Sequence, residues 1–314
     1  MELLRLLETV RIPFFDALFS GVTYLGDEIA AIAVILIVLW CFDKRLGYYL
    51  LYATVCSVSI NQLLKAVFCI PRPWVRDPDF TIVESARAAA TGYSFPSGHT
   101  ANVTTLFGGI ARYIRHTGVR IALVALIVLV AFSRMYLGVH TPLDVSVSLC
   151  IGIVLVFGVY WLFGRAERSR AAAYVLNGAV LALAVGLALY VELAPAGPDA
   201  VPENTLEGVK NAYTVLGLSC GLLTVRWLDK RWIGYDVRAV WWAQLLKCAL
   251  GVGVLLGLKT LLKAPLFALT GGHACADSLR YYLLVVFGGA VWPLTFRWFA
   301  RLGNKRGGDP AVQA

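Results

Sequence analysis

Charged residues are scarce in this chain of 314 residues. Asp, Glu, Lys and Arg together make up 15% of it, whereas 59% is hydrophobic, and the mean hydropathy is +0.72. A soluble domain would be expected to carry about a quarter charged residues in clear amphipathic patterns. The composition therefore excludes an ordinary soluble domain and indicates a membrane protein whose chain crosses the bilayer several times.

The chain also lacks the patterns of a metal site or a disulfide framework. Its seven cysteines show no CxxC spacing and mostly fall inside apolar runs, so we interpret them as small hydrophobic core residues. No paired Asp and Glu and no cluster of His and Cys suits a cation, so we expect no metal and no cofactor. No cleavable signal peptide is expected, because Glu2, Arg5 and Glu8 interrupt the first apolar residues.

Apolar residues at helical spacing predict an all-α protein. Residues 1–19 place leucines and a valine between charged residues, which is typical of an amphipathic helix that lies in the membrane interface. Most of the later hydrophobic segments have about the 20 residues that cross a bilayer. We therefore expect a polytopic transmembrane helical bundle of about nine spans, at roughly 20–42, 46–70, 98–115, 119–138, 142–164, 172–192, 211–228, 238–262 and 279–299.

The basic loops predict the orientation of the bundle and explain the net charge of +9. They alternate with the less basic loops 71–97, 193–210 and 263–278, so the positive-inside rule places the N-terminus outside and the C-terminus inside. We accordingly expect a multi-pass plasma-membrane protein with no nucleic-acid partner. The basic loops are 43–45, 112–120, 164–170, 226–231 and the tail 297–306.

Three polar clusters map to the outer ends of the expected spans. They are "KAVFCIPRP" at 65–73, "PSGH" at 96–99, and "SRMYLGVHTPLD" at 133–144. Lys65 and Arg72 are seven residues apart, which predicts two turns along one helix face. The topology brings all three clusters to the same membrane face, even though long loops separate them in the sequence.

We expect these clusters first of all to bind an anion. Lys65, Arg72 and Arg134 supply three cations, and an arginine can grip phosphate oxygens with a fork of N–H groups. Ser97 and Gly98 stand where a helix begins, so free backbone N–H groups and the helix dipole favour an anion there. Together these residues are expected to form a phosphate cradle.

The histidines add the chemistry of group transfer. In "HTPLD", Thr141 is suited to an N-cap and Pro142 to the first helical position, so Asp144 can reach back to His140. A carboxylate that accepts the Nδ1 proton leaves Nε2 as a nucleophile. His99 can protonate a leaving oxygen and later accept a proton from water. The set predicts phosphoryl transfer through a phosphohistidine, with arginines in place of a metal.

Each cluster also has a simpler interpretation when taken alone. Lys65 and Arg134 could extend to the interface, "PSGH" could be an ordinary helix start, and a His–Asp pair is more often a structural hydrogen bond. The joint occurrence favours function, because polar groups at this depth are costly unless they are used.

The three motifs resemble the signatures of the type-2 phosphatidic-acid phosphatase superfamily, in the same order and with the same internal spacing. The resemblance covers about residues 20–160 and implies a metal-independent phosphoric monoester hydrolase, with residues 20–164 as the phosphatase core and 165–314 as additional transmembrane helices. It implies a nucleophile, its partner and an acid/base at His140, Asp144 and His99, and a phosphate cradle of Lys65, Arg72, Ser97, Gly98 and Arg134.

The resemblance leaves the substrate open. A site at the outer interface beside an amphipathic helix favours a lipid phosphate or diphosphate monoester: polyprenyl diphosphate, phosphatidate, phosphatidylglycerophosphate or sphingoid phosphate. The nine-span count is similar instead to glucose-6-phosphatase, which favours a soluble sugar phosphate. Transfer to another lipid, and a transporter or scramblase with a degenerate phosphate site, are the further alternatives. Lys247, in the middle of an expected span, fits the transporter, and no pattern indicates the oligomeric state.

Overall fold

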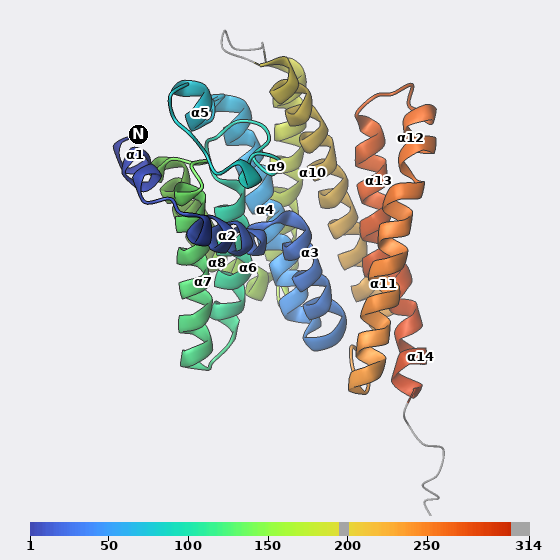
Figure 1. Ribbon diagram of the computed structural model, residues 1–314. Coiled ribbons are helices and arrows are strands. Elements are labelled where there is room, and N and C mark those ends of the chain that lie inside the picture. Colours follow the sequence, from blue (N-terminus) through green and yellow to red (C-terminus); the bar gives the residue numbers. More distant parts are fainter. Residues whose placement is uncertain (195–200, 303–314) are drawn as a thin grey trace, which may run out of the picture.

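Helices form every regular element that the structure describes. The computed structural model describes residues 1–194 and 201–302, and Figure 1 shows these as a bundle of upright helices with shorter ones at both ends. The expected all-α fold is confirmed for these residues.

Six helical segments are long and apolar enough to cross a membrane, and a bent pair, Pro13–Gly26 with Glu28–Phe42, adds a seventh if it is counted as one span. The count of nine is not confirmed. Of the other expected spans, α6 (Gly98–Tyr113) has only 16 residues, and α10 (Pro202–Leu228) is less apolar. The six segments are Lys44–Arg76, Thr117–Tyr136, Pro142–Ala166, Arg170–Leu193, Trp241–Leu269 and Cys275–Arg301.

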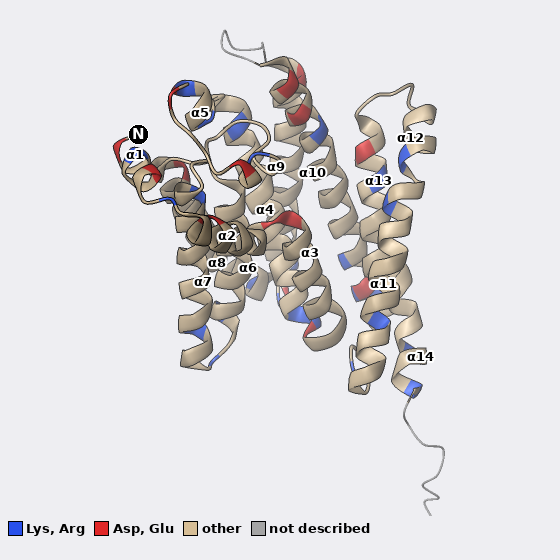
Figure 2. Ribbon diagram, viewed as in Figure 1, with Lys and Arg blue, Asp and Glu red and all other residues tan. Residues whose placement is uncertain are grey.

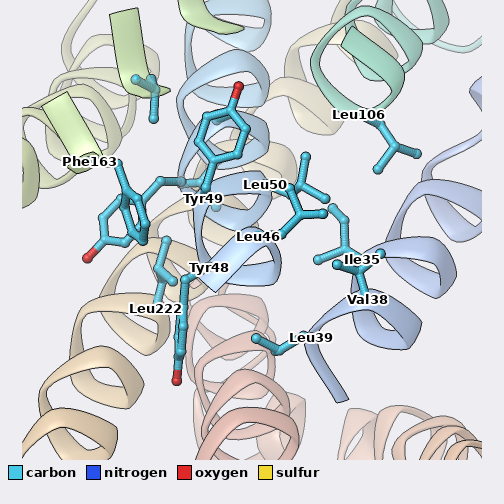
Figure 3. Close-up of a cluster of buried hydrophobic side chains, with 14 of the residues drawn as sticks. Ile35, Val38, Leu39, Leu46, Tyr48, Tyr49, Leu50, Leu106, Phe163 and Leu222 are labelled. Carbon is cyan, nitrogen blue, oxygen red and sulfur yellow. The ribbon is translucent and has the colours of Figure 1, made fainter. Parts of the chain in front are cut away.

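The helix α4 (Lys44–Phe68) forms the centre of the bundle. It packs against α6, α8 (Pro142–Ala166), α9 (Arg170–Leu193) and α10. Figure 3 shows side chains of several helices gathered around its first turns, among them Tyr49, Phe163 and Leu222. All three are buried, so one apolar core joins the two halves of the chain.

The remaining helices extend the bundle on either side of α10. The helix α7 (Thr117–Tyr136) packs against α6, while α10 lies between α9 and α13 (Cys275–Val286) (Figure 1). The last helices are α11 (Trp241–Leu261), α12 (Lys263–Leu269) and α14 (Phe296–Arg301), and the short helices are α3 (Glu28–Ile37) and α5 (Pro73–Arg76).

The N-terminal segment is two helices where we expected one over 1–19. The helix α1 (Glu2–Thr9) ends before Pro13, which begins α2 (Pro13–Thr23), because proline suits the first helical position. Arg5 of α1 forms an ion pair of 2.7 Å with Asp77. The segment therefore contacts the long loop between α4 and α6.

The two ends of the bundle differ in charge. Figure 2 shows the ribbon mainly blue around the end where α7 begins and α14 ends, and most of its red segments, together with further blue ones, toward the opposite end, where α10 begins. The basic loops predicted from the sequence thus share one end, although residues 303–306 of the tail lie outside the described residues, as do 195–200 of the loop 193–210. Which compartment each end faces stays a prediction.

The cysteines correct our interpretation of them as core residues. Only Cys56 is buried, Cys150 is exposed, and the other five are partly exposed. All seven are free thiols, and the sulfurs of Cys41 and Cys248 lie 3.2 Å apart. Apolar flanks did not distinguish burial in the bundle from contact with lipid, because both environments favour the same residues.

Glycine allows α10 and α13 to pack at very short range. A Cβ atom on Gly217 would lie 2.1 Å from the carbonyl oxygen of Ser278, and one on Gly221 would lie 2.7 Å from the Cβ atom of Val285. The neighbour of Gly217 is backbone, which cannot rotate away. This contact holds the last helices against the rest of the bundle.

We expect Gly217→Ala to destabilise the protein by about 1–3 kcal/mol, because overpacking forces the two helices apart. Thermal unfolding of the detergent-solubilised protein measures the effect. Gly186→Ala in α9 is the control, since nothing lies within 4 Å of its added Cβ atom and alanine favours helix. Equal melting temperatures for wild type and Gly217→Ala would contradict the close packing.

Candidate active site

A cavity of about 510 Å³ lies between α4, the beginning of α6 and the facing ends of α9 and α10. It collects residues from all three predicted clusters, which are far apart in the sequence. The predicted site residues that line it are Lys65, Arg72, Gly98, His99, Arg134 and His140. The other two, Ser97 and Asp144, are buried beside it at 0% and 2% exposure.

The two cations of the first cluster do not share a helix face, as we had expected. The helix α4 ends at Phe68, and Cys69 turns the chain with a left-handed φ of 47°. Arg72 then stands between two prolines as the N-cap residue of α5. Proline disfavours helix at the residue before it, so a continuous helix through Arg72 is excluded.

Arg72 is held by backbone carbonyls on both sides of the cavity. Its Nε donates to the carbonyl of Gly92 at 3.1 Å, its Nη2 to that of Thr91 at 2.5 Å, and its Nη1 to that of Val139 at 3.1 Å. The same Nη1 lies 2.9 Å from Nε2 of His140. The guanidinium therefore points at the histidine nitrogen predicted to be the nucleophile.

Each of the other two cations also donates one hydrogen bond to a neutral oxygen, and Arg134 has further N–H groups without a partner among the described residues. Lys65 donates to the carbonyl of Tyr93, and Nη1 of Arg134 donates to the hydroxyl of Thr23 at 2.6 Å. Arg134 is 0% exposed, yet its Nε and Nη2 have no partner among the described residues. Buried donors are costly without acceptors, so an anion in the cavity would satisfy them.

The beginning of α6 supplies the backbone part of the cradle. Ser97 caps the helix, and its hydroxyl accepts from the backbone N–H of Thr100 at 3.4 Å. Gly98 and His99 form the first turn, whose N–H groups favour an anion. Gly26 packs against His99, where a Cβ atom would lie 2.9 Å from the Cβ atom of His99. Only glycine allows this approach.

Asp144 lies beside His140 without a hydrogen bond to it. Thr141 and Asp144 form the expected capping box at the start of α8. The carboxylate Oδ2 accepts from the backbone N–H of Thr141 at 2.7 Å and from the hydroxyl of Ser94 at 2.6 Å. The distance from Oδ2 to Nδ1 of His140 is 3.5 Å, and this nitrogen has no hydrogen bond among the described residues. The expected hydrogen bond between Asp144 and His140 is therefore not formed, although the two side chains lie close together.

His140 lies in the loop between α7 and α8, and its surroundings favour the neutral ring. Burial is the main cause that lowers the pKa of His140 well below its ordinary value. The positive charges of Arg72, Arg134 and Lys65 lower this pKa further. A neutral imidazole keeps a lone pair on one ring nitrogen, which nucleophilic attack requires.

Comparison with known families settles the relationship of the chain. Residues 46–168 match the PAP2 superfamily, and residues 213–305 match the PAP2 superfamily phosphatase, transmembrane extension. The chain belongs to the PAP2 superfamily. This confirms the phosphatidic-acid phosphatase resemblance of the three motifs and extends it to the C-terminal helices.

Relatives of this PAP2 protein include lipid phosphatases. It is 34% identical over 133 residues to the undecaprenyl-diphosphatase BcrC of Bacillus subtilis, covering 41% of this chain and 66% of the relative. It is 29% identical over 231 residues to a probable sphingosine-1-phosphate phosphatase of Dictyostelium discoideum, and this match covers 68% of this chain and 53% of the relative. The chain thus spans about two thirds of the first relative and about half of the second.

Among solved structures, the chain is similar to the crystal structure of Aquifex aeolicus LpxE. The identity is 30%, the TM-score is 0.44, and the match covers 51% of this chain and 93% of that chain.

Sequence reasoning missed the groups that hold the PAP2 site in place. The carbonyls that orient the cations carry no side-chain signal, and only the position of Ser94, close to "PSGH", could have suggested its contact with Asp144. It predicted additional helices after residue 164 but not that they line the cavity, as Tyr190 of α9 and Glu207 of α10 do. Glu207 accepts a hydrogen bond from Thr91 at 2.7 Å, so α10 steadies the loop that holds Arg72.

Lys247 takes no part in this cavity. It is 1% exposed on α11, donates to the carbonyl of Val237 at 3.0 Å, and its ammonium lies 4.3 Å from the ring centre of Phe296. It is therefore a buried lysine in the bundle of the extension, at a distance from the predicted site.

The low pKa of His140 predicts how stability depends on pH. Below about pH 6.5 the unfolded state binds a proton on this histidine while the folded state does not. The unfolding free energy therefore falls by about 1.4 kcal/mol for each unit by which the pH is lowered. We expect His140→Asn to remove this contribution. Thermal unfolding between pH 8 and pH 5 measures both proteins, and parallel pH profiles would show that His140 is not held neutral.

Proposed function

We propose that this PAP2 protein is a membrane phosphatase that hydrolyses a lipid phosphate or diphosphate monoester through a phosphohistidine on His140. We further propose that it acts at the extracytoplasmic face and needs no metal. One observation carries the proposal: Nε2 of His140 lies 2.9 Å from a guanidinium, in a cavity that Lys65, Arg134 and His99 also line. Membership of the superfamily and the names of its relatives support the same activity.

The arrangement suits two successive displacements at phosphorus. In the first, Nε2 of His140 forms a bond to phosphorus, the bond to the lipid oxygen breaks, and His99 protonates that oxygen. In the second, water attacks the phosphohistidine, His99 takes the water proton, and the P–N bond breaks to release phosphate. Arg72 must turn from Nε2 to the phosphate oxygens, whose charge the cations and the α6 N–H groups stabilise.

The donor set favours cations over a metal for this stabilisation. The described residues contain no group of three or more His, Cys, Asp or Glu that could hold a metal ion. Three cationic side chains line the cavity instead, and two N–H groups of the buried Arg134 have no other acceptor there. Guanidinium forks match the oxygens of a phosphate.

The cavity wall favours a lipid over a soluble sugar phosphate. Val67 and Phe68, near the end of α4, line the cavity and are also 45% and 54% exposed. They offer an apolar surface to the chain of a lipid whose phosphate lies among the cations. Because the span count of nine is not confirmed, it no longer favours the sugar phosphatase.

Separating the two chemical steps tests the mechanism. With an aryl phosphate, whose leaving group needs no acid, we expect His99→Ala to release about one aryl alcohol per protein in a burst and then to stall as the phosphoenzyme. His140→Ala should show neither burst nor turnover, at least about 1000-fold below wild type. Rapid-quench measurement of aryl alcohol and phosphate follows both steps, with a chelator present throughout.

His273→Ala is the matched control, because this exposed histidine lies in the loop before α13, outside the cavity. It should keep the wild-type rate. Phosphate release by His140→Ala at the rate of wild type would remove the phosphohistidine, and lipid flipping without phosphate release would favour the scramblase. Loss of wild-type turnover on chelation would contradict independence from a metal.

A substitution in the apolar surface near the end of α4 tests the substrate class. We expect Phe68→Ser to raise KM for a long-chain lipid phosphate about tenfold, because it removes apolar contact with the chain. The same variant should leave KM for a short-chain analogue unchanged. Leu245→Ser, at an exposed position of α11 outside the cavity, is the matched control. Faster turnover of glucose 6-phosphate than of any lipid would contradict a lipid substrate.

A further inference from the structure

A second hollow, of about 970 Å³, lies at the opposite, basic end of the bundle, where α4 and α9 begin and α6 and α8 end. Its lining residues include four arginines and no aspartate or glutamate. We call it the basic groove, and its arginines are Arg45, Arg112, Arg165 and Arg168.

Aromatic rings hold two of these arginines in position. The guanidinium of Arg112 lies 4.4 Å from the ring centre of Tyr160, and that of Arg165 lies 4.1 Å from the ring centre of Trp161. Such cation–π contacts fix the direction of a guanidinium without neutralising its charge. Trp161 is itself 57% exposed, so the groove borders an apolar surface on the side of the bundle.

Some other basic residues near this end have acidic partners, whereas the groove arginines have none among the described residues. Lys44 pairs with Asp229 at 3.1 Å, while Glu167 pairs with Lys230 at 3.1 Å and also with Arg226. None of the four groove side chains has an ion pair or hydrogen bond among the described residues. Four like charges face one hollow, and an anion in it would offset their repulsion.

The beginning of α9 adds a further attraction for an anion. Ser169 caps this helix of 24 residues, and both Ser169 and Ala172 line the groove. The first N–H groups of a helix lack partners within it, and the positive end of its dipole favours negative charge. The backbone N–H of Ala172 donates to the Ser169 hydroxyl at 3.4 Å, so the contribution of α9 to the groove is the positive end of its dipole.

We propose that the basic groove binds the phosphate headgroup of an anionic phospholipid, which is distinct from the substrate. The exposed ring of Trp161 sets the groove beside lipid, where acyl chains can lie along α8 while the headgroup contacts the arginines. Basic pockets between transmembrane helices are known sites for acidic headgroups. The groove is at the far end of the bundle from the candidate active site, which separates this lipid from the substrate.

Binding to lipid-depleted protein tests the proposal without using phosphatase activity. The probes are cardiolipin and phosphatidylglycerol, with phosphatidylcholine for comparison, and native mass spectrometry in neutral detergent counts the bound lipid. The double variant Arg45→Gln with Arg168→Gln leaves both aromatic contacts intact. We expect it to weaken cardiolipin binding about 25-fold, from about fivefold for each arginine.

The control is Arg231→Gln with Arg301→Gln, which removes the same charge outside the groove. It should change cardiolipin affinity less than twofold, and both double variants should keep the wild-type rate of phosphate release. Equal loss of affinity in the two double variants, or no preference of wild type for anionic lipid, would overturn the proposal. Displacement of cardiolipin by millimolar inorganic phosphate would show a site for the free ion instead.

Discussion

The mutual repulsion of three cations in one cavity is the constraint on which this structure depends. Lys65, Arg72 and Arg134 line the same hollow, and Arg72 and Arg134 are almost fully buried. Their donors are held chiefly by carbonyl oxygens of loops and by one threonine hydroxyl. Carbonyl and hydroxyl acceptors fix the cations without adding a negative charge. Asp27, Glu28 and Glu207 also line the cavity, but none of them forms an ion pair with these cations among the described residues.

The surrounding fold can be understood as support for the loops that provide these acceptors. The N-terminal helix α1 contacts the long loop before α6 through the ion pair of Arg5 and Asp77. From the other side, Glu207 of α10 contacts Thr91, whose carbonyl holds Arg72. The helix α10 packs closely against α13 at Gly217 and Gly221. The transmembrane extension therefore supports the helix that contacts the candidate site. The second half of the chain thus contacts the loop that holds Arg72 in the first half.

The two ends of the bundle use arginine in different ways. At the candidate active site, Arg134 is 0% exposed and its unpartnered donors face a cavity, an arrangement suited to a charge that must be stabilised away from water. In the basic groove the arginines are exposed and lie over rings or in solvent. Such arginines suit a bound headgroup, because screening and hydration make each contact weak and several are needed.

The sequence alone determined the helical membrane fold, the superfamily and the eight residues that gather in or beside one cavity, because apolar length and local motif chemistry are written in consecutive residues. It misjudged the helix through Arg72 and the burial of most cysteines, and its count of nine spans is not confirmed. Tertiary structure alone decided that the hydroxyl of Ser94 donates a hydrogen bond to Asp144, that carbonyls orient the cations, and that α9 and α10 line the cavity. These contacts join distant parts of the chain through groups that every residue carries, so no local pattern records them.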